Sequence, residues 1–126
     1  MKYLLDTVTV VRHLTDIGHI GTKAIGILNA FDNNFLISVV SLMEIMYLSE
    51  KHRIEIDLTE TLNKIESSSL YSVVDLTPEI LKVAEITSFR ELHDRLILST
   101  AKWLEIPVIS SDKTFDKVEG IEVIWN

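Results

Sequence analysis

Short apolar runs alternate along the chain with stretches in which apolar residues recur every three or four positions. The runs are rich in β-branched residues and predict strands, whereas the recurrence predicts amphipathic helices. Most of the runs are almost continuously apolar, as is typical of strands covered by helices on both faces. The pattern therefore predicts an α/β fold, in which helices pack against a parallel sheet. We expect its strands at residues 3–5, 35–40, 72–75, 108–110 and 121–125.

Four helices are expected in the stretches between the strands. Residues 77–79 combine a hydroxyl cap, a proline and an acid, which together mark the start of a helix. A longer helix is expected over residues 91–104, with Ile97, Ala101 and Leu104 buried. Two earlier helices have apolar faces made of Ala24, Leu28 and Phe31, and of Leu58, Leu62 and Ile65.

Composition limits the class of protein. The chain has 126 residues, of which 47% are hydrophobic and 25% charged, the balance of an ordinary globular domain. It contains no linker-like or repetitive segment, so we expect a single domain over residues 1–126. The absence of cysteine excludes disulfides, thiolate zinc sites and cysteine nucleophiles, and suits a reducing cytoplasm. No signal-peptide pattern or membrane-spanning apolar stretch is present, so we expect no membrane association.

The formal net charge is −7. Such a charge opposes broad electrostatic attraction to a polyanion. If the substrate is a nucleic acid, bound cations, a basic partner or a local rim of lysine and arginine must offset part of this charge.

Four acids occupy related places in the predicted fold. Asp6 directly follows the first strand, Glu44 lies in the first turn after the second, and Asp112 follows the fourth. Residues just past parallel strands converge at the carboxyl edge of the sheet. Asp94 lies near the start of the long helix before the fourth strand, and a right-handed crossover places that start at the same edge. We therefore expect these four carboxylates to meet.

Such a cluster requires positive charge. Two carboxylates 4 Å apart repel by about 4 kcal/mol at an effective dielectric constant of about 20. Protonation or a bound cation relieves this repulsion. All-oxygen ligands favour Mg²⁺ or Mn²⁺ over zinc. Such ions activate water and stabilise the leaving oxygen of a phosphodiester, so the pattern indicates phosphodiester hydrolysis.

Each acid also has a purely structural interpretation. Ser41 and Glu44 have the spacing of a capping box, and residues 57–60 have the same spacing without evident chemistry. Asp94 in a first helical turn would complement the helix dipole. Asp112 would be an ordinary turn residue. Asp6 is the hardest to explain in this way, because it directly follows a buried strand.

Four segments carry a family resemblance that covers essentially the whole chain. They are residues 3–7 (YLLDT), 37–45 (ISVVSLMEI), 92–101 (LHDRLILSTA) and 106–113 (IPVISSDK). In order and spacing they resemble the PIN-domain family, in particular the VapC-like toxins of VapBC toxin–antitoxin pairs. The most specific piece is the His-Asp-Arg segment, followed some eighteen residues later by a strand and an acid.

The resemblance implies an α/β/α sandwich with a five-stranded parallel sheet. It further implies a cytoplasmic, Mg²⁺- or Mn²⁺-dependent endoribonuclease that forms a homodimer and is the toxin of a VapBC-type pair, held inactive by an antitoxin. By the same resemblance, Asp6, Glu44, Asp94 and Asp112 are the catalytic and metal-binding acids, and Thr7, Ser110 and Asp116 are auxiliary residues.

Two positions depart from the family pattern. Val8 stands where relatives often carry Asn, His or Ser, and Met43 where they often carry Trp. Neither removes an acid, but Val8 leaves the pocket one polar group short. The alternative function is therefore a catalytically silent PIN-fold module that binds metal or protein. A haloacid-dehalogenase-like phosphatase needs an aspartate where Val8 stands, and a receiver domain needs an acidic neighbour for Asp6, so both are disfavoured.

Some other residues near these acids remain open to two interpretations. Arg95 and Lys113 follow two of the acids and are explained equally well by phosphate contact or by ion pairing with the neighbouring carboxylates. The histidines lack metal-ligand spacing, and only His93 lies beside a predicted site residue. The apolar segment 43–48 exceeds the needs of a core, which is consistent with a dimer or antitoxin groove.

Overall fold

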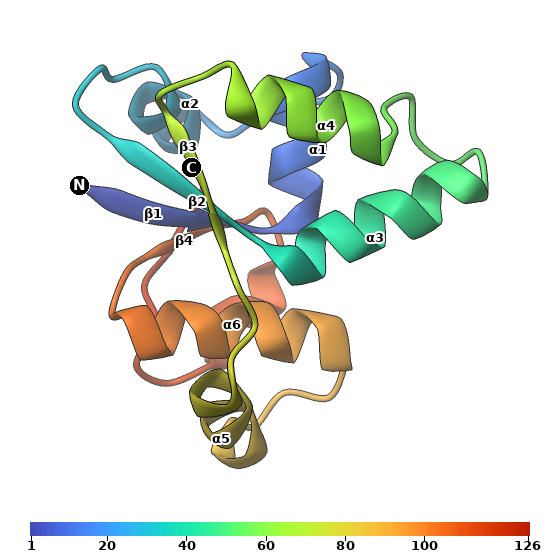
Figure 1. The fold of residues 1–126 in the computed structure, drawn as a ribbon. Coiled ribbons are helices and arrows are strands. Elements are labelled where there is room, and N and C mark those ends of the chain that lie inside the picture. The colour runs from blue at the N-terminus through green and yellow to red at the C-terminus, as the bar shows by residue number, and fades with distance from the viewer.

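The computed structural model describes residues 1–126 and contains one five-stranded sheet in the order β3-β2-β1-β4-β5. All four strand pairs are parallel, which confirms the predicted α/β class (Figure 1). The central β1 pairs with β2 from Lys2 opposite Asn34 to Leu5 opposite Ile37. The strands are β1 (Lys2–Leu5), β2 (Asn34–Ser38), β3 (Tyr71–Val74), β4 (Val108–Ile109) and β5 (Val123–Ile124).

Six α-helices and one 3₁₀ helix connect the strands. Most of them begin at a side-chain cap. The predicted helix start at residues 77–79 is confirmed: Thr77 caps α5, its hydroxyl accepts a hydrogen bond from the Ile80 N–H, and Pro78 is the first helical residue. The helices are α1 (Thr7–Thr15), α2 (Thr22–Leu28), α3 (Val39–Glu50), α4 (Leu58–Glu66), α5 (Pro78–Ile86), α6 (Leu92–Leu104) and η1 (Lys113–Lys117). None of them is long and apolar enough to cross a membrane.

Side chains that alternate along each strand supply two separate cores. Leu5 and Ile37 point to the face covered by α1, α2, α3 and α4, whereas Leu4 and Leu36 point to the face covered by α5 and α6. The period of two in a strand causes this division, since successive side chains leave opposite faces. The result is a three-layer α/β/α arrangement, with α5 and α6 together on one side of the sheet (Figure 1).

The second strand is shorter than the sequence pattern predicts. It ends at Ser38, and the expected strand residues 39–40 instead open α3. The Ser38 hydroxyl accepts a hydrogen bond from the Val40 N–H, so it caps the helix although β-branched residues follow it. Capping and tertiary packing outweigh the strand propensity of the two valines.

Several further expectations fail at element ends. Phe31 does not share a buried helical face with Leu28, because α2 ends at Leu28 and Phe31 is 98% exposed in the loop. The third strand ends at Val74 and lies at the sheet edge, where two of its four side chains are exposed. An edge strand has a neighbour on one side only, so the continuous apolar pattern does not mean full burial there. The fourth and fifth strands keep only two residues each, and Ser110 lies just past β4.

Candidate functional site

The four predicted acids come from four different parts of the chain, and the fold gathers them at the carboxyl edge of the sheet, close enough for their charges to interact; the region between their side chains is the carboxylate crevice. Asp6 follows β1, Asp112 follows β4, Glu44 lies on α3 and Asp94 lies in the first turn of α6. Their charges act on one another, as the pKa of Asp94 shows. This pKa is raised to about 7, first by burial and then by the negative charges of Glu91, Glu44, Asp112 and Asp6, in that order. Like charges disfavour ionisation, so the raised pKa reflects a concentration of negative charge.

Asp6 is the most buried member of the group, with 6% of its surface exposed. Its Oδ1 accepts the Thr9 N–H at 3.0 Å and so caps α1, a role that the sequence analysis did not anticipate. Its Oδ2 accepts the Ser110 hydroxyl at 2.6 Å. Burial raises the pKa of Asp6, and the bonds from Ser110 and Thr9 partly oppose that rise. Both oxygens are therefore held in fixed directions at the centre of the sheet edge.

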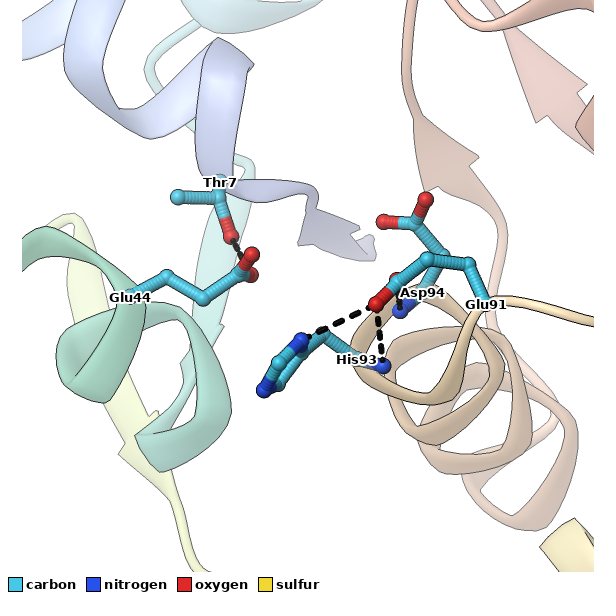
Figure 2. A network of polar contacts seen from close by, with 5 residues as sticks. All are labelled: Thr7, Glu44, Glu91, His93 and Asp94. Carbon is cyan, nitrogen blue, oxygen red and sulfur yellow. Dashed lines mark hydrogen bonds and ion pairs between the residues drawn. The ribbon is translucent and has the colours of Figure 1, made fainter. Parts of the chain in front are cut away.

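Glu44 does not cap a helix, and the capping-box interpretation is wrong. The helix α3 starts at Val39, which leaves Glu44 in its second turn, beyond the free N–H groups. Glu44 Oε1 instead accepts the hydroxyl of Thr7 at 2.6 Å, across from α1 (Figure 2). Burial raises the pKa of Glu44, while the Thr7 bond and the nearby His93 lower it. The side chain is thus directed toward the crevice, as the functional interpretation requires.

The similar motif at Asp57 is a real helix cap. The Asp57 carboxylate accepts the Glu60 N–H at 2.8 Å at the start of α4. Sequence spacing alone does not separate the two cases, because what differs is the residue at which each helix begins.

Asp94 lies across the crevice from Glu44, at the start of α6 (Figure 2). Its N–H donates to Glu91 at 2.7 Å, but no hydrogen bond or ion pair holds its half-buried carboxylate within the chain. The acid that caps α6 is Glu91, which also accepts the backbone N–H of His93. Burial alone would raise the pKa of Glu91, but the bonds from Asp94 and His93 hold it below its usual value. Glu91 thus supplies the negative charge at the N-terminus of α6, and the Asp94 carboxylate is not needed for that role.

Asp112 combines a turn role with a place in the crevice. Its Oδ1 accepts both the N–H and the hydroxyl of Thr114, at 2.9 and 2.6 Å, and so caps η1. Its own N–H donates to the Ser110 hydroxyl at 3.0 Å, and that hydroxyl donates to Asp6. Ser110 therefore links two of the acids, and the turn interpretation of Asp112 is correct without excluding a second role.

The three predicted auxiliary residues differ in burial and in their contacts with the acids. Thr7 and Ser110 are buried and donate to Glu44 and Asp6 respectively. Asp116 is exposed in η1 and lines a hollow of about 230 Å³ together with Asp112. Two participants were missed by the sequence analysis: buried Ser41, whose hydroxyl is hydrogen-bonded to that of Thr7 at 2.9 Å, and Glu91. Glu91 stands three residues before Asp94, a spacing that suits an acidic cap, whereas Ser41 was misassigned as a cap.

The donor set fits a hard divalent cation. The charges of the four carboxylates act on one another, the chain has no cysteine, and one of the carboxylates has no partner in the chain. No three of these groups are close enough to hold one ion in a closed cage. Mg²⁺ usually keeps several water ligands and binds through one or two carboxylates, so it needs no such cage.

Ion pairing does not explain the two cations beside the acids. One ion pair is present in the chain, between His93 Nδ1 and Glu91 Oε1 at 3.0 Å. Arg95 and Lys113 therefore do not pair with Asp94 or Asp112. Of the two interpretations offered by the sequence, the ion-pair one is wrong for both residues.

An apolar surface lies next to the crevice on α3. Met43, Met46 and Tyr47 are 44%, 40% and 53% exposed. Together with Glu44 and His93 they line a hollow of about 400 Å³. Exposed apolar groups gathered in this way usually mark a protein–protein contact.

Comparison with known proteins identifies the family of the chain and solved structures with the same fold. Residues 3–121 match the model of the PIN domain. A search of curated proteins by sequence gives no match.

Solved structures with the same fold cover almost the whole chain. VapBC2 from Rickettsia felis, bound to a promoter DNA fragment, is 17% identical, with all of both chains covered and a TM-score of 0.74. DNA-bound VapBC from Salmonella typhimurium is 20% identical, with 98% of this chain and 97% of that chain covered and a TM-score of 0.70. VapBC-5 from Mycobacterium tuberculosis, a member of the VapBC family of toxin–antitoxin systems, is 17% identical at 98% and 97% coverage and a TM-score of 0.64. At such identities the similarity establishes the fold, and it confirms the expected PIN-like architecture.

Proposed function

Because the chain belongs to the PIN-domain family, whose members are generally nucleases that use divalent metal, we propose that it is a Mg²⁺- or Mn²⁺-dependent endoribonuclease. We further propose that it is the toxin of a VapBC-type pair. The similarity to VapBC structures supports this role. The acids that we assign to metal binding and catalysis are Asp6, Glu44, Asp94 and Asp112.

The observation that carries the proposal is the state of Asp94. Its carboxylate is half-buried and unpartnered, and burial together with four neighbouring acids raises its pKa to about 7. A fold that serves only as a scaffold gains nothing from this repulsion, because an uncompensated buried charge costs stability. A bound divalent cation would convert the cost into binding energy.

The residues of the chain have separate tasks in this proposal. A Mg²⁺ or Mn²⁺ ion bound through one or two of the four acids, with water as its other ligands, would supply the positive charge that activates water and stabilises the leaving oxygen of the phosphodiester. Thr7 fixes the direction of Glu44, and Ser110 fixes that of Asp6, through the two 2.6 Å hydrogen bonds. Such outer partners typically change metal affinity or activity by 10- to 100-fold when removed. Asp94, with no partner in the chain, is free to accept a proton or a cation.

Cleavage of an RNA pool by the purified chain tests the proposal. We expect cleavage with Mg²⁺ or Mn²⁺, none with EDTA, and a loss of about 100-fold or more in Asp6→Asn and Asp94→Asn. Asp32→Asn is the matched control, since this exposed acid precedes β2 at the opposite edge of the sheet. Circular dichroism checks that each variant is folded. Equal activity in the wild type and in both site variants would refute the assignment.

A second function is favoured by two observations. No three of the acids form a closed metal cage, and the exposed Val8 leaves the crevice short of one polar group. A catalytically silent module that binds metal or protein would have both properties. Thermal stabilisation by Mg²⁺ without cleavage of any RNA would establish this module and exclude the nuclease.

We assign the antitoxin to the apolar surface formed by Met43, Met46 and Tyr47 on α3. A protein segment seated there would lie against Glu44 and His93, which share the same hollow, and would block access to the acids. Met46→Lys should abolish co-purification with a co-expressed antitoxin while RNA cleavage persists, because Met46 is exposed and is not one of the four acids or their hydrogen-bond partners. The expected homodimer is tested by sedimentation equilibrium, and a monomer at micromolar concentration would contradict it.

A further inference from the structure

A basic hollow lies beside the carboxylate crevice and has no place in the chemistry described above. It has a volume of about 490 Å³ and is lined by the segment before α6, by α6 itself and by η1. Three cations, Arg90, Arg95 and Lys117, contribute to its lining, together with the exposed hydroxyl residues Ser88 and Thr114. No acid contributes.

This composition is unusual for the present chain. The protein has 19 acids against 12 lysines and arginines, so a hollow lined by cations without any acid runs against the overall charge of the chain. Four other hollows, of about 230 to 400 Å³, each include an acid, with Asp112, Glu44, Glu105 or Glu119 among their lining residues. An acid-free basic hollow therefore stands out from the surface around it.

The cations of this hollow are unpaired. The chain's one ion pair joins His93 and Glu91, so Arg90, Arg95 and Lys117 have no acidic partner. The Arg95 Nε is buried without any hydrogen-bond partner. A buried donor without an acceptor is unfavourable, and an anion bound in the hollow would offer it one.

Covalent and hydrogen-bonded links join the hollow to the crevice. Arg95 directly follows Asp94 at the start of α6. Thr114 lines the hollow and donates its hydroxyl to Asp112 at 2.6 Å. Asp112 is thus hydrogen-bonded to a residue that lines the hollow, and Asp94 directly precedes another one in the chain.

We propose that this hollow binds a backbone phosphate of the RNA, one that flanks the phosphodiester at the carboxylates. The inference rests on the proposed function and adds the contact that holds the substrate. Guanidinium groups bind phosphate oxygens through paired N–H donors, and a lysine adds charge. The hollow thereby offsets, locally, the repulsion between the polyanion and a protein of net charge −7. Contacts to phosphate carry no base preference, so the hollow positions the RNA without selecting its sequence.

Binding of a mixed-sequence, 5′-fluorescein-labelled RNA in EDTA tests the proposal without any need for cleavage. The variant is Arg90→Ala/Lys117→Ala, because both side chains are exposed and their removal leaves the core intact. We expect an affinity about tenfold lower at low salt. The slope of log K against log salt should fall in magnitude by about 0.7, the value for one phosphate contact in a single strand. Arg90→Glu/Lys117→Glu should weaken binding further.

The matched control is Lys23→Ala/Lys64→Ala, which removes two exposed lysines from α2 and α4, on the other side of the sheet. The control should bind RNA like the wild type. Wild-type affinity and salt slope in Arg90→Ala/Lys117→Ala, or an equal loss in the control, would overturn the phosphate site. Wild-type protein that binds RNA but never cleaves it with Mg²⁺ or Mn²⁺ would refute the proposed function, while the loss of binding in Arg90→Ala/Lys117→Ala would still support the site.

Discussion

Asp94→Asn should stabilise the metal-free protein while it abolishes the proposed activity. The pKa of this carboxyl group rises from its ordinary value of 3.8 to about 7 in the folded chain, chiefly through burial and then through Glu91 and Glu44. At about 1.36 kcal/mol per pKa unit, this rise corresponds to a cost of at most about 4 kcal/mol when the group is ionised. The side chain is only half-buried, so solvent screening reduces the expected gain to about 1–2 kcal/mol.

The sign of the pH dependence follows from the direction of the shift. The folded state holds the Asp94 proton more tightly than the unfolded state, so the folded protein loses stability as pH rises from 3.8 to about 7. The cost is absent below this range and complete above it. The advantage of Asp94→Asn should therefore be largest at pH 8, shrink markedly by pH 5 and vanish near pH 3.5.

Chemical denaturation in EDTA at pH 8 and pH 5 measures this difference. Asp32→Asn serves as the control because Asp32 is exposed, away from the crevice, and its stability change should be near zero at both pH values. Added Mg²⁺ should reverse the order, since the wild type gains binding energy that the variant lacks. An Asp94→Asn protein that is less stable than the wild type at pH 8 without metal would refute the repulsion on which the site assignment rests.

Three further variants test the supports of the site and fold. Thr7→Val removes the hydroxyl that orients the glutamate of α3, and should lower Mg²⁺ affinity or cleavage by about 10- to 100-fold, as measured by metal titration and RNA cleavage. Ser110→Ala leaves the buried carboxylate of Asp6 without its donor and should cost about 1–3 kcal/mol in denaturant unfolding; a change below 0.5 kcal/mol would contradict the assigned hydrogen bond. Gly21→Ala would place a Cβ 2.2 Å from the Trp125 carbonyl oxygen, so it should displace the chain end and cost about 1–3 kcal/mol, visible as a lowered Tm.

The order of apolar runs and helical stripes was sufficient to predict the α/β class and the edge at which the acids meet. Parallel strands end at one edge whatever their exact length, so errors of one or two residues at strand ends did not move Asp6 or Asp112 away from it. Sequence also identified the start of α5 at Thr77, because that signal depends only on neighbouring residues.

Tertiary structure alone decided the roles of individual side chains. Whether Glu44 capped a helix depended on where α3 began, and the cap at Ser38 placed that start ahead of Ser41. The partners Thr7 and Glu44 are 37 residues apart, and Ser110 and Asp6 are 104 apart, so no local pattern could pair them. The four acids could be named from the sequence. Their hydrogen bonds, the free carboxylate of Asp94 and the unpaired cations beside it exist only because the fold brings distant residues into contact.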